Sequence, residues 1–281
     1  MAVPLQPLAV RSGPGDAPVV SAYREYLPAS VAARAVTCTW QGIPGWPREM
    51  RLLPDGCLDL VWDGQRARAV RPAARPVRRP VGGPALVTGI RVRPGWVAAI
   101  LGMPVRDLPD VADLAEVWGN ACARRLEDAM TAAATPAAGR AVLTEAVAGR
   151  LARAADPDPG ILAAVSLLGQ PRATAGEAAR RAGLSQRQLR RCFDEQVGLP
   201  PKTLQTILRF QRFRAWLARS GEARVPLSRG AAECGYFDHA HLCRDCARLA
   251  GVTPAILQGA SRRAASIQNA DATSPSSDGT T

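Results

Sequence analysis

The pattern of apolar and polar positions changes along the chain. In the first third, short apolar runs such as Ala35–Trp40, Leu58–Trp62 and Ala85–Val92 are separated by turn residues, including PDG at 54–56 and GGP at 82–84. Apolar runs of this length, bounded by turns, predict antiparallel strands. We therefore expect a β-sheet or open barrel in this part of the chain.

Helical spacing replaces this pattern after Pro94. It predicts helices at 96–101, from Val111 to Met130 and from Ala137 to Arg153. Strands followed by helices are typical of an α+β domain. The segment 71–80 carries four arginines among its prolines and is expected to be an extended loop.

Proline, glycine and aspartate at 152–160 indicate a boundary between two domains. From about Gln258 the chain is rich in Ser, Ala, Thr, Asn and Gly and has no apolar period, which predicts disorder. We expect an N-terminal α+β domain over 1–155, an all-α C-terminal domain over 160–258, and a disordered tail over 259–281.

The C-terminal domain contains a weak internal repeat: residues 234–257 resemble residues 182–204. Its first copy predicts a helix-turn-helix. Thr174 and Glu177 fit a capping box, Gly183 suits a sharp turn, and Ser185 with Gln188 fits a second capping box. Four residues of this copy recur 53 positions later: Leu189, Gly198, Pro201 and Leu204 at Leu242, Gly251, Pro254 and Leu257.

The helix that follows Ser185 would bury Leu189, Phe193 and Val197 and turn its arginines outward. In the second copy, Leu227 to Cys234 predicts the first helix, Gly235 the turn and Asp238 the N-cap of the next helix. That helix would bury Leu242, Cys246 and Leu249. The stretch 200–221 predicts one long helix joining the two units, with an inward stripe at Leu204, Ile207, Leu208, Gln211 and Ala215.

Charge points to the same half of the chain. The protein has 36 basic and 24 acidic side chains, and all the basic ones except Lys202 are arginine. Residues 160–263 hold 17 of the basic and only 7 of the acidic side chains. A surplus of this kind favours a polyanionic partner, nucleic acid before membrane, although an arginine-favouring proteome would also produce it.

The block 160–258 resembles the DNA-binding domain of AraC/XylS-family transcription regulators. The matching motifs are AxxAGLSxRQLRRxF at 179–193, GLPPKTLQTILRFQRF at 198–213, PLSRGAAECGYFDHAHLCRD at 226–245 and AGVTP at 250–254. The resemblance implies double-stranded DNA as partner and no enzymatic activity. It assigns DNA contacts to Gln186, Arg187, Arg190 and Arg191 in the first unit and to His239, Ala240, Cys243 and Arg244 in the second.

Two positions depart from the family pattern. Gly230 stands where the family has a large aliphatic residue, and Cys246 where it has Phe. Both changes are expected to loosen the second unit.

The N-terminal half resembles a non-catalytic sensor-type domain through YREYLP (23–28), LLPDGCLDLVWDG (52–64) and IRVRPGWVAAILG (90–102). This resemblance implies a sensor or dimerisation role. A small-molecule effector and a homodimer are therefore open alternatives, and the effector is not identified.

Other chemistries are weaker readings of the same residues. Cys243 and Cys246 form a C-x-x-C, but no second cysteine pair completes a zinc site, and we expect no metal or cofactor. An Ada-type methyl-accepting regulator would need clustered cysteines, whereas Cys38, Cys57 and Cys122 are isolated.

A small-molecule-binding enzyme is the other alternative. Both histidines, His239 and His241, lie late in the chain, which excludes histidine-dependent catalysis before them. Asp55, Asp59 and Asp63 are read as turn and exposed strand positions rather than as catalytic carboxylates. Without an apolar run of about 18 residues or a secretory signal, we expect a cytoplasmic protein.

Overall fold

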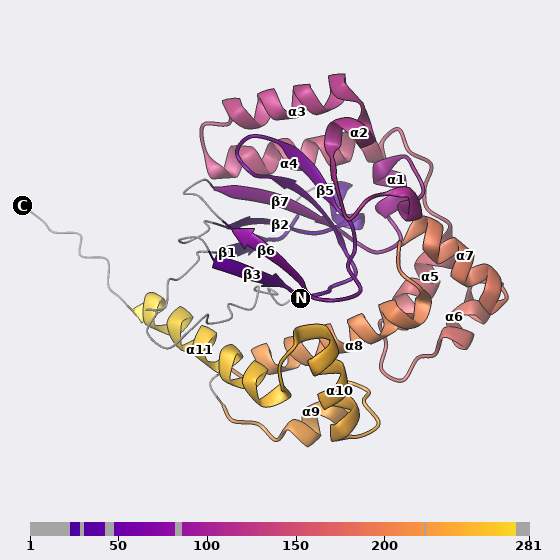
Figure 1. Ribbon diagram of the computed structural model, residues 1–281, viewed down its shortest axis with the longest axis vertical. Coiled ribbons are helices and arrows are strands. Elements are labelled where there is room, and N and C mark those ends of the chain that lie inside the picture. Colours follow the sequence, from indigo (N-terminus) through magenta and orange to yellow (C-terminus); the bar gives the residue numbers. More distant parts are fainter. Residues whose placement is uncertain (1–22, 29–30, 43–47, 82–85, 222, 274–281) are drawn as a thin grey trace, which may run out of the picture.

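Six antiparallel strands form the main sheet of the N-terminal domain, in the order β1-β2-β7-β4-β5-β8 (Figure 1). The computed structural model describes residues 23–28, 31–42, 48–81, 86–221 and 223–273. The three strands predicted from the apolar runs are β2, β4 and β7, which lie side by side within the sheet; the turn predicted at 82–84 lies outside the described residues. The strands of this sheet are β1 (Tyr23–Tyr26), β2 (Val36–Gly42), β4 (Leu58–Trp62), β5 (Ala67–Val70), β7 (Val87–Val92) and β8 (Val111–Asp113).

One face of this sheet forms the N-terminal core. In β4, buried Leu58, Leu60 and Trp62 alternate with half-buried Asp59 and Val61, because successive side chains of a strand point to opposite faces. The buried face packs against helices, and Figure 1 shows α3 and α4 stacked over the sheet. The covering elements are η1 (Val31–Arg34), α1 (Val97–Leu101), η2 (Val105–Asp107), α2 (Leu114–Trp118), α3 (Asn120–Ala132) and α4 (Pro136–Leu151).

Two N-terminal predictions are wrong in part. The expected loop at 71–80 contains the start of β6 (Val77–Val81), which pairs with β3 (Arg48–Leu52) in a separate two-stranded sheet. A strand of a two-stranded sheet has a free edge, which tolerates the missing N–H of Pro80. The single helix expected from Val111 to Met130 is instead β8, α2 and α3, interrupted at Gly119, whose φ of 84° ends the helical path.

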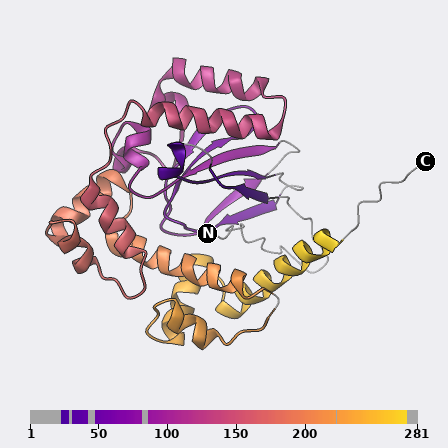
Figure 2. The same cartoon turned by 180° about the vertical axis from the view of Figure 1, so that it is seen from behind.

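The C-terminal domain is all-α, as the sequence predicts (Figure 2). It has its own hydrophobic core. Both views show α6 and α7 at one end of the long helix α8, and α9 and α10 toward the other. Its helices are α5 (Pro159–Leu168), α6 (Ala175–Arg181), α7 (Gln186–Gln196), α8 (Pro201–Arg219), α9 (Leu227–Glu233), α10 (His239–Ala250) and α11 (Pro254–Thr273).

Helix α8 is buried over more of its surface than the predicted stripe. Leu204, Ile207 and Gln211 are buried as expected, while Leu208 and Ala215 are only half-buried. The additional buried side chains arise because α8 packs against both helix-turn-helix units as well as α5 and α11. They include Thr206, Phe210, Phe213, Trp216 and Leu217.

The disordered tail predicted from residue 259 is also wrong in part. Helix α11 continues to Thr273, and only residues 274–281 of that tail lie outside the described part of the chain. The segment is rich in alanine, which has the highest helix propensity, so it forms a helix without the apolar period that was sought.

The two domains contact each other through several side chains. Leu53 of the N-terminal domain packs against the C-terminal core, and Leu162 of α5 packs against the N-terminal core. The Gln211 side-chain amide of α8 donates to the Pro54 carbonyl. The connection is therefore a packed interface as well as a covalent link.

Candidate nucleic-acid interface

The first helix-turn-helix consists of α6 and α7, joined by a tight glycine turn. Gly183 has φ of 68°, and Leu184 N donates to Ala179 O at 2.9 Å, which closes the end of α6. Gln188 N donates to Ser185 Oγ at 3.3 Å, and the Gln188 amide oxygen accepts from Ser185 N at 2.9 Å. The predicted capping box is thus present and fixes where α7 begins.

The second helix-turn-helix, α9 and α10, has the same backbone plan. Gly235 has φ of 81°, and Tyr236 N donates to Ala231 O at 2.9 Å, matching the bond made by Leu184 in the first unit. Asp238 Oδ1 accepts from His241 N at 2.6 Å, which caps α10. The sequence repeat is therefore also a structural repeat.

The outer face of α7 is cationic and polar. Gln186, Arg187, Arg190 and Arg191 are all exposed, while Leu189 and Phe193 of the same helix are buried. Within the described residues, none of these three arginines forms an ion pair with an acidic side chain. Their guanidinium groups are available to an anionic partner.

The outer face of α10 has a different character. His239, Ala240 and Arg244 are exposed, and Cys243 is half-buried with its sulfur 3.6 Å from His239 Nδ1. The helix therefore presents one arginine, one imidazole and two small side chains. The sequence places these residues on the outer face correctly, but it did not single out Phe237, which directly precedes the cap and is 93% exposed.

Helix α10 is fixed to α8 by a nearly buried ion pair. Arg209 Nη2 of α8 donates to Asp245 Oδ2 of α10 at 2.7 Å and lies 2.9 Å from His241 Nε2. The Arg209 guanidinium also lies over the Tyr236 ring, 4.8 Å from its centroid. Burial and the nearby Arg209 charge lower the pKa of His241 below its usual 6.5. Arg209 thus holds α10 against α8 and positions the second unit.

At Gly230, one of the two departures from the family pattern, a neighbouring side chain fills the space. A Cβ on Gly230 would lie 2.6 Å from Trp216 Cζ3, so the indole of α8 occupies the space of the missing side chain. Trp216 Nε1 also donates to Glu233 Oε2 at 2.7 Å. Cys246 is completely buried in the C-terminal core. The loosening expected at Gly230 is therefore offset by Trp216.

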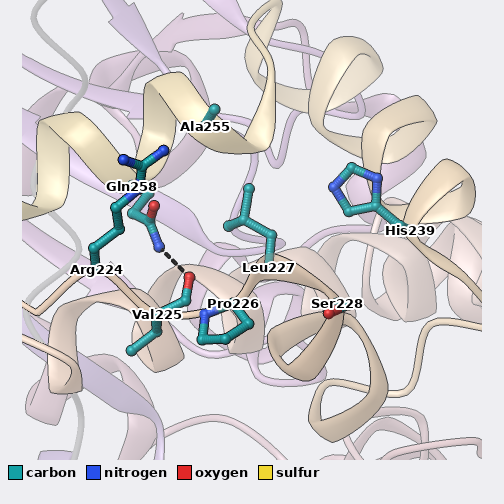
Figure 3. Close-up of a pocket in the computed structure, with 8 residues that line it drawn as sticks. All are labelled: Arg224, Val225, Pro226, Leu227, Ser228, His239, Ala255 and Gln258. Atoms are coloured by element: carbon teal, nitrogen blue, oxygen red, sulfur yellow. Dashed lines mark hydrogen bonds between the residues drawn. The ribbon is translucent and has the colours of Figure 1, made fainter.

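A shallow pocket of about 420 Å³ lies beside the start of α10 (Figure 3). Gln258 Nε2 of α11 donates to the Val225 carbonyl at 2.7 Å and closes one side of it. Arg224 and Ser228 offer hydrogen-bond donors at its edge, and both are exposed. The remaining lining residues are Pro226, Leu227, His239 and Ala255.

Asp55 and Asp59 form a structural cluster around Arg91, so Asp59 is not the exposed strand position that the sequence suggested; Asp55 lies in the predicted turn, where its Oδ1 accepts from Cys57 N at 2.9 Å. Arg91 Nε lies 2.9 Å from Asp55 Oδ2 and 3.1 Å from Asp59 Oδ1, and Arg91 Nη1 donates to Glu25 at 3.0 Å. Burial raises the pKa of Asp55, against the opposing effect of Arg91. Asp63, the third candidate, pairs with Arg68.

The cysteines are separate thiols in the described residues. Burial raises the pKa of Cys38 and Cys246 to about 12 each, so neither is an activated thiolate. Among the residues that the structure describes, no three His, Cys, Asp or Glu side chains are grouped to hold a metal ion.

Comparison with protein families identifies the type of the C-terminal domain. Residues 178–259 match the family model described as a helix-turn-helix domain; they include the last part of α6, all of α7 and α8, and the second helix-turn-helix unit. The C-terminal domain is an AraC-type helix-turn-helix domain. This family supports a DNA-binding transcription regulator. Ahead of the AraC-type domain, residues 24–112 match a domain of unknown function (DUF6597).

Two further comparisons add little to the AraC-type assignment. The crystal structure of an apo ToxT variant from Vibrio cholerae is similar to this chain, with 8% identity and a TM-score of 0.44 over 79% of this chain and 96% of that one. A search of curated proteins gives no match. No helix in the described residues is long and apolar enough to span a bilayer.

Proposed function

We propose that the protein is a sequence-specific transcription regulator that places α7 and α10 in successive major grooves on one face of the DNA. The observation that carries the proposal is the duplicated unit: two glycine turns, two N-capped helices and one connecting helix packed against both. Recognition helices held in this way would contact two short elements about 10 bp apart, one turn of B-DNA.

The two helices would read different features. Arginine forms paired hydrogen bonds with guanine O6 and N7, so Arg187, Arg190 and Arg191 of α7 favour a guanine-rich first element. Gln186 lies in the first turn of the same helix. His239, Ala240, Cys243 and Arg244 of α10 offer fewer strong donors, and the second element should depend less on guanine.

Arg224 and Ser228 support a contact with the DNA backbone. They border the pocket beside the start of α10 (Figure 3). We expect them to bind a phosphate of the DNA when that helix enters the major groove. Contacts of this kind fix the register of a protein on DNA and carry no base preference.

The N-terminal domain is proposed to sense an effector or to dimerise, in keeping with its packing against α8. A charged group links the two domains: Asp55 acts electrostatically on Arg214 of α8, whose pKa is lowered to about 10, mainly by burial. We propose that a change in the N-terminal domain reaches α8 through this contact, through the Gln211–Pro54 hydrogen bond and through the packing of Leu53 against the C-terminal core. Analytical ultracentrifugation of the full chain with and without operator DNA tests the dimer.

The test of the main proposal is selection of binding sites from a random pool of DNA duplexes by the full-length protein. We expect two enriched elements about 10 bp apart. Affinity for the enriched duplex should fall linearly in a log–log plot between about 50 and 200 mM salt, because bound arginines release counterions. No enrichment, or affinity that is independent of salt, would refute the proposal.

A further inference from the structure

Phe237 is the most exposed large apolar side chain in the described part of the chain. Its exposed fraction is 93%, compared with 73% for Leu27, 51% for Ile256 and 37% for Leu52. A solvated phenyl ring forgoes roughly 1.5–3 kcal/mol of burial. Phe237 also lies directly before Asp238, the cap of α10. Packing within the protein therefore does not explain why this exposed position holds a phenylalanine.

The local structure offers Phe237 an apolar neighbour that it does not use. A residue just before an N-cap commonly packs against the fourth residue of the helix, here Leu242. Leu242 is completely buried without it. The neighbouring ring, Tyr236, takes the interior position instead, where it packs edge-on against Phe213 with centroids 6.4 Å apart. The turn therefore directs Tyr236 inward and Phe237 outward.

Phe237 extends the outer face of α10. Ala240 and Arg244 follow it at spacings of three and seven, and both are exposed. The N-terminal residues of a recognition helix are those that reach base edges. The domain around this ring carries a large basic surplus, which favours DNA as the occupant over another basic surface of the same chain.

We infer that Phe237 contacts the C5-methyl group of a thymine in the second half of the binding site, and that this contact sets the base preference of α10. The inference rests on the proposed DNA-binding function. Thymine is the only base with a methyl group in the major groove, and apolar side chains recognise it by contact. Ala240, three residues after Phe237, is exposed and small, so it does not obstruct the approach of a base edge to this face of α10. The second unit thus reads a methyl group where the first reads guanine hydrogen-bond acceptors.

The experiment combines a change in the protein with a change in the DNA. Duplexes enriched by the full-length wild-type protein are remade with uracil in place of thymine, one position at a time across the second element. Uracil removes the methyl group and keeps every hydrogen-bonding group. One or two of these replacements should weaken wild-type binding roughly three- to fivefold, the value of one buried methyl-sized group.

Phe237→Ala should bind the thymine duplex roughly tenfold more weakly and lose its sensitivity to uracil at the same position. Its salt dependence should equal that of the wild type, because phenylalanine neutralises no phosphate. Leu27→Ala removes another exposed apolar side chain, far from α10 in the sequence and in the other domain, and should change neither quantity. Since Phe237 is outside the core, its variant is expected to keep the wild-type melting temperature.

Several outcomes overturn the inference while leaving the proposed function intact. Unchanged DNA affinity of Phe237→Ala would mean that the ring serves another partner, such as a protein. Equal losses on thymine and uracil duplexes would place the ring against sugar or phosphate. If the wild-type protein enriches no sequence at all, the proposed function itself fails.

Discussion

Arg209 of α8 donates a 2.7 Å hydrogen bond to the Asp245 carboxylate of α10, and the exposed fractions of the two side chains are only 17% and 9%. The residues are 36 positions apart, so the pair closes a tertiary contact between the connecting helix and the second recognition helix. The ion pair serves to orient α10, because a buried ion pair adds little stability compared with two apolar side chains of similar size.

Arg209→Ala should nevertheless lower the free energy of unfolding by about 2–4 kcal/mol, because it leaves the buried Asp245 carboxylate with only the longer contacts to Arg248, at 3.5 Å, and His241, at 3.7 Å. Urea unfolding of the full-length chain measures this value. Arg229→Ala is the matched control: its pair with Glu233 is exposed, and we expect almost no effect. Equal effects of the two variants would contradict the role assigned to Arg209.

The lowered pKa of His241 predicts a dependence of stability on pH. Burial and Arg209 disfavour the protonated imidazole in the folded state, although Asp245 and Asp238 act in the opposite direction and Arg244 adds to the effect of Arg209. The unfolded state therefore binds more protons than the folded state as pH falls through 6.5, the usual value. Stability contributed by neutral His241 is complete above that pH and is lost below it.

His241→Gln should remove this part of the pH dependence. Thermal unfolding of both proteins between about pH 8 and 5 should show a smaller decline in the variant, because glutamine does not titrate in this range. The comparison separates His241 from carboxylates such as Asp55, which titrate in both proteins. Parallel curves would mean that His241 keeps its ordinary pKa in the folded protein.

A substitution at Gly230 tests whether the Trp216 indole occupies the space that a side chain at position 230 would need. Gly230→Ala places a methyl carbon within 3 Å of the indole ring, so we expect a loss of about 1–3 kcal/mol from overpacking. Gly176→Ala in α6 is the control, since its nearest contact would be at 3.5 Å and alanine favours the helix. In chemical unfolding, Gly230→Ala should lower the free energy of unfolding, and Gly176→Ala should raise it or leave it unchanged.

Local features of this fold were predictable because each is encoded by neighbouring residues. The capping boxes at Thr174 and Ser185 and the left-handed turns at Gly183 and Gly235 depend on residues within four positions of one another. The strands β2, β4 and β7 followed from apolar runs in the same way.

The features that the sequence did not reveal depend on distant contacts. No local pattern identifies the partner of Arg209, or determines that Tyr236 turns inward and Phe237 outward. Asp59 alternates with leucines as an exposed strand residue would, but its side of the sheet holds Arg91 and Glu25, so it forms part of an ionic cluster. The part of helix α11 after Gln258 was missed because it is rich in helix-forming alanine and has no apolar stripe.

Gln211 tests the contact between the domains. Gln211→Leu leaves the buried Pro54 carbonyl without the Gln211 donor, and it removes one of the partners of Arg214, the Gln211 amide oxygen at 3.1 Å. The free energy of unfolding of the full-length chain should fall by about 1–2 kcal/mol. In a fragment of residues 157–273, position 211 no longer faces Pro54, and the same change should have a smaller effect. We expect this fragment to fold on its own core and to bind operator DNA more weakly than the full chain. If Gln211→Leu lowers the free energy of unfolding equally in the full chain and in the fragment, Gln211 stabilises the C-terminal domain alone and not the contact between the domains.

Arg187 and Arg190 distinguish base reading from general attraction to DNA. Replacing either with alanine should cost about 1–3 kcal/mol on the selected duplex and relax the preference at one base pair, because a bidentate contact with guanine is lost. Arg224→Ala, at the edge of the pocket beside α10, should instead weaken binding to all duplexes alike and make the salt dependence shallower by about one unit. Titrations of each variant with the selected duplex, with duplexes changed at single guanines and with random duplexes measure these differences. Arg187→Ala and Arg190→Ala could instead weaken binding to selected and random duplexes by the same factor. That result would mean that the two side chains contact phosphates, and that α7 does not read bases through them.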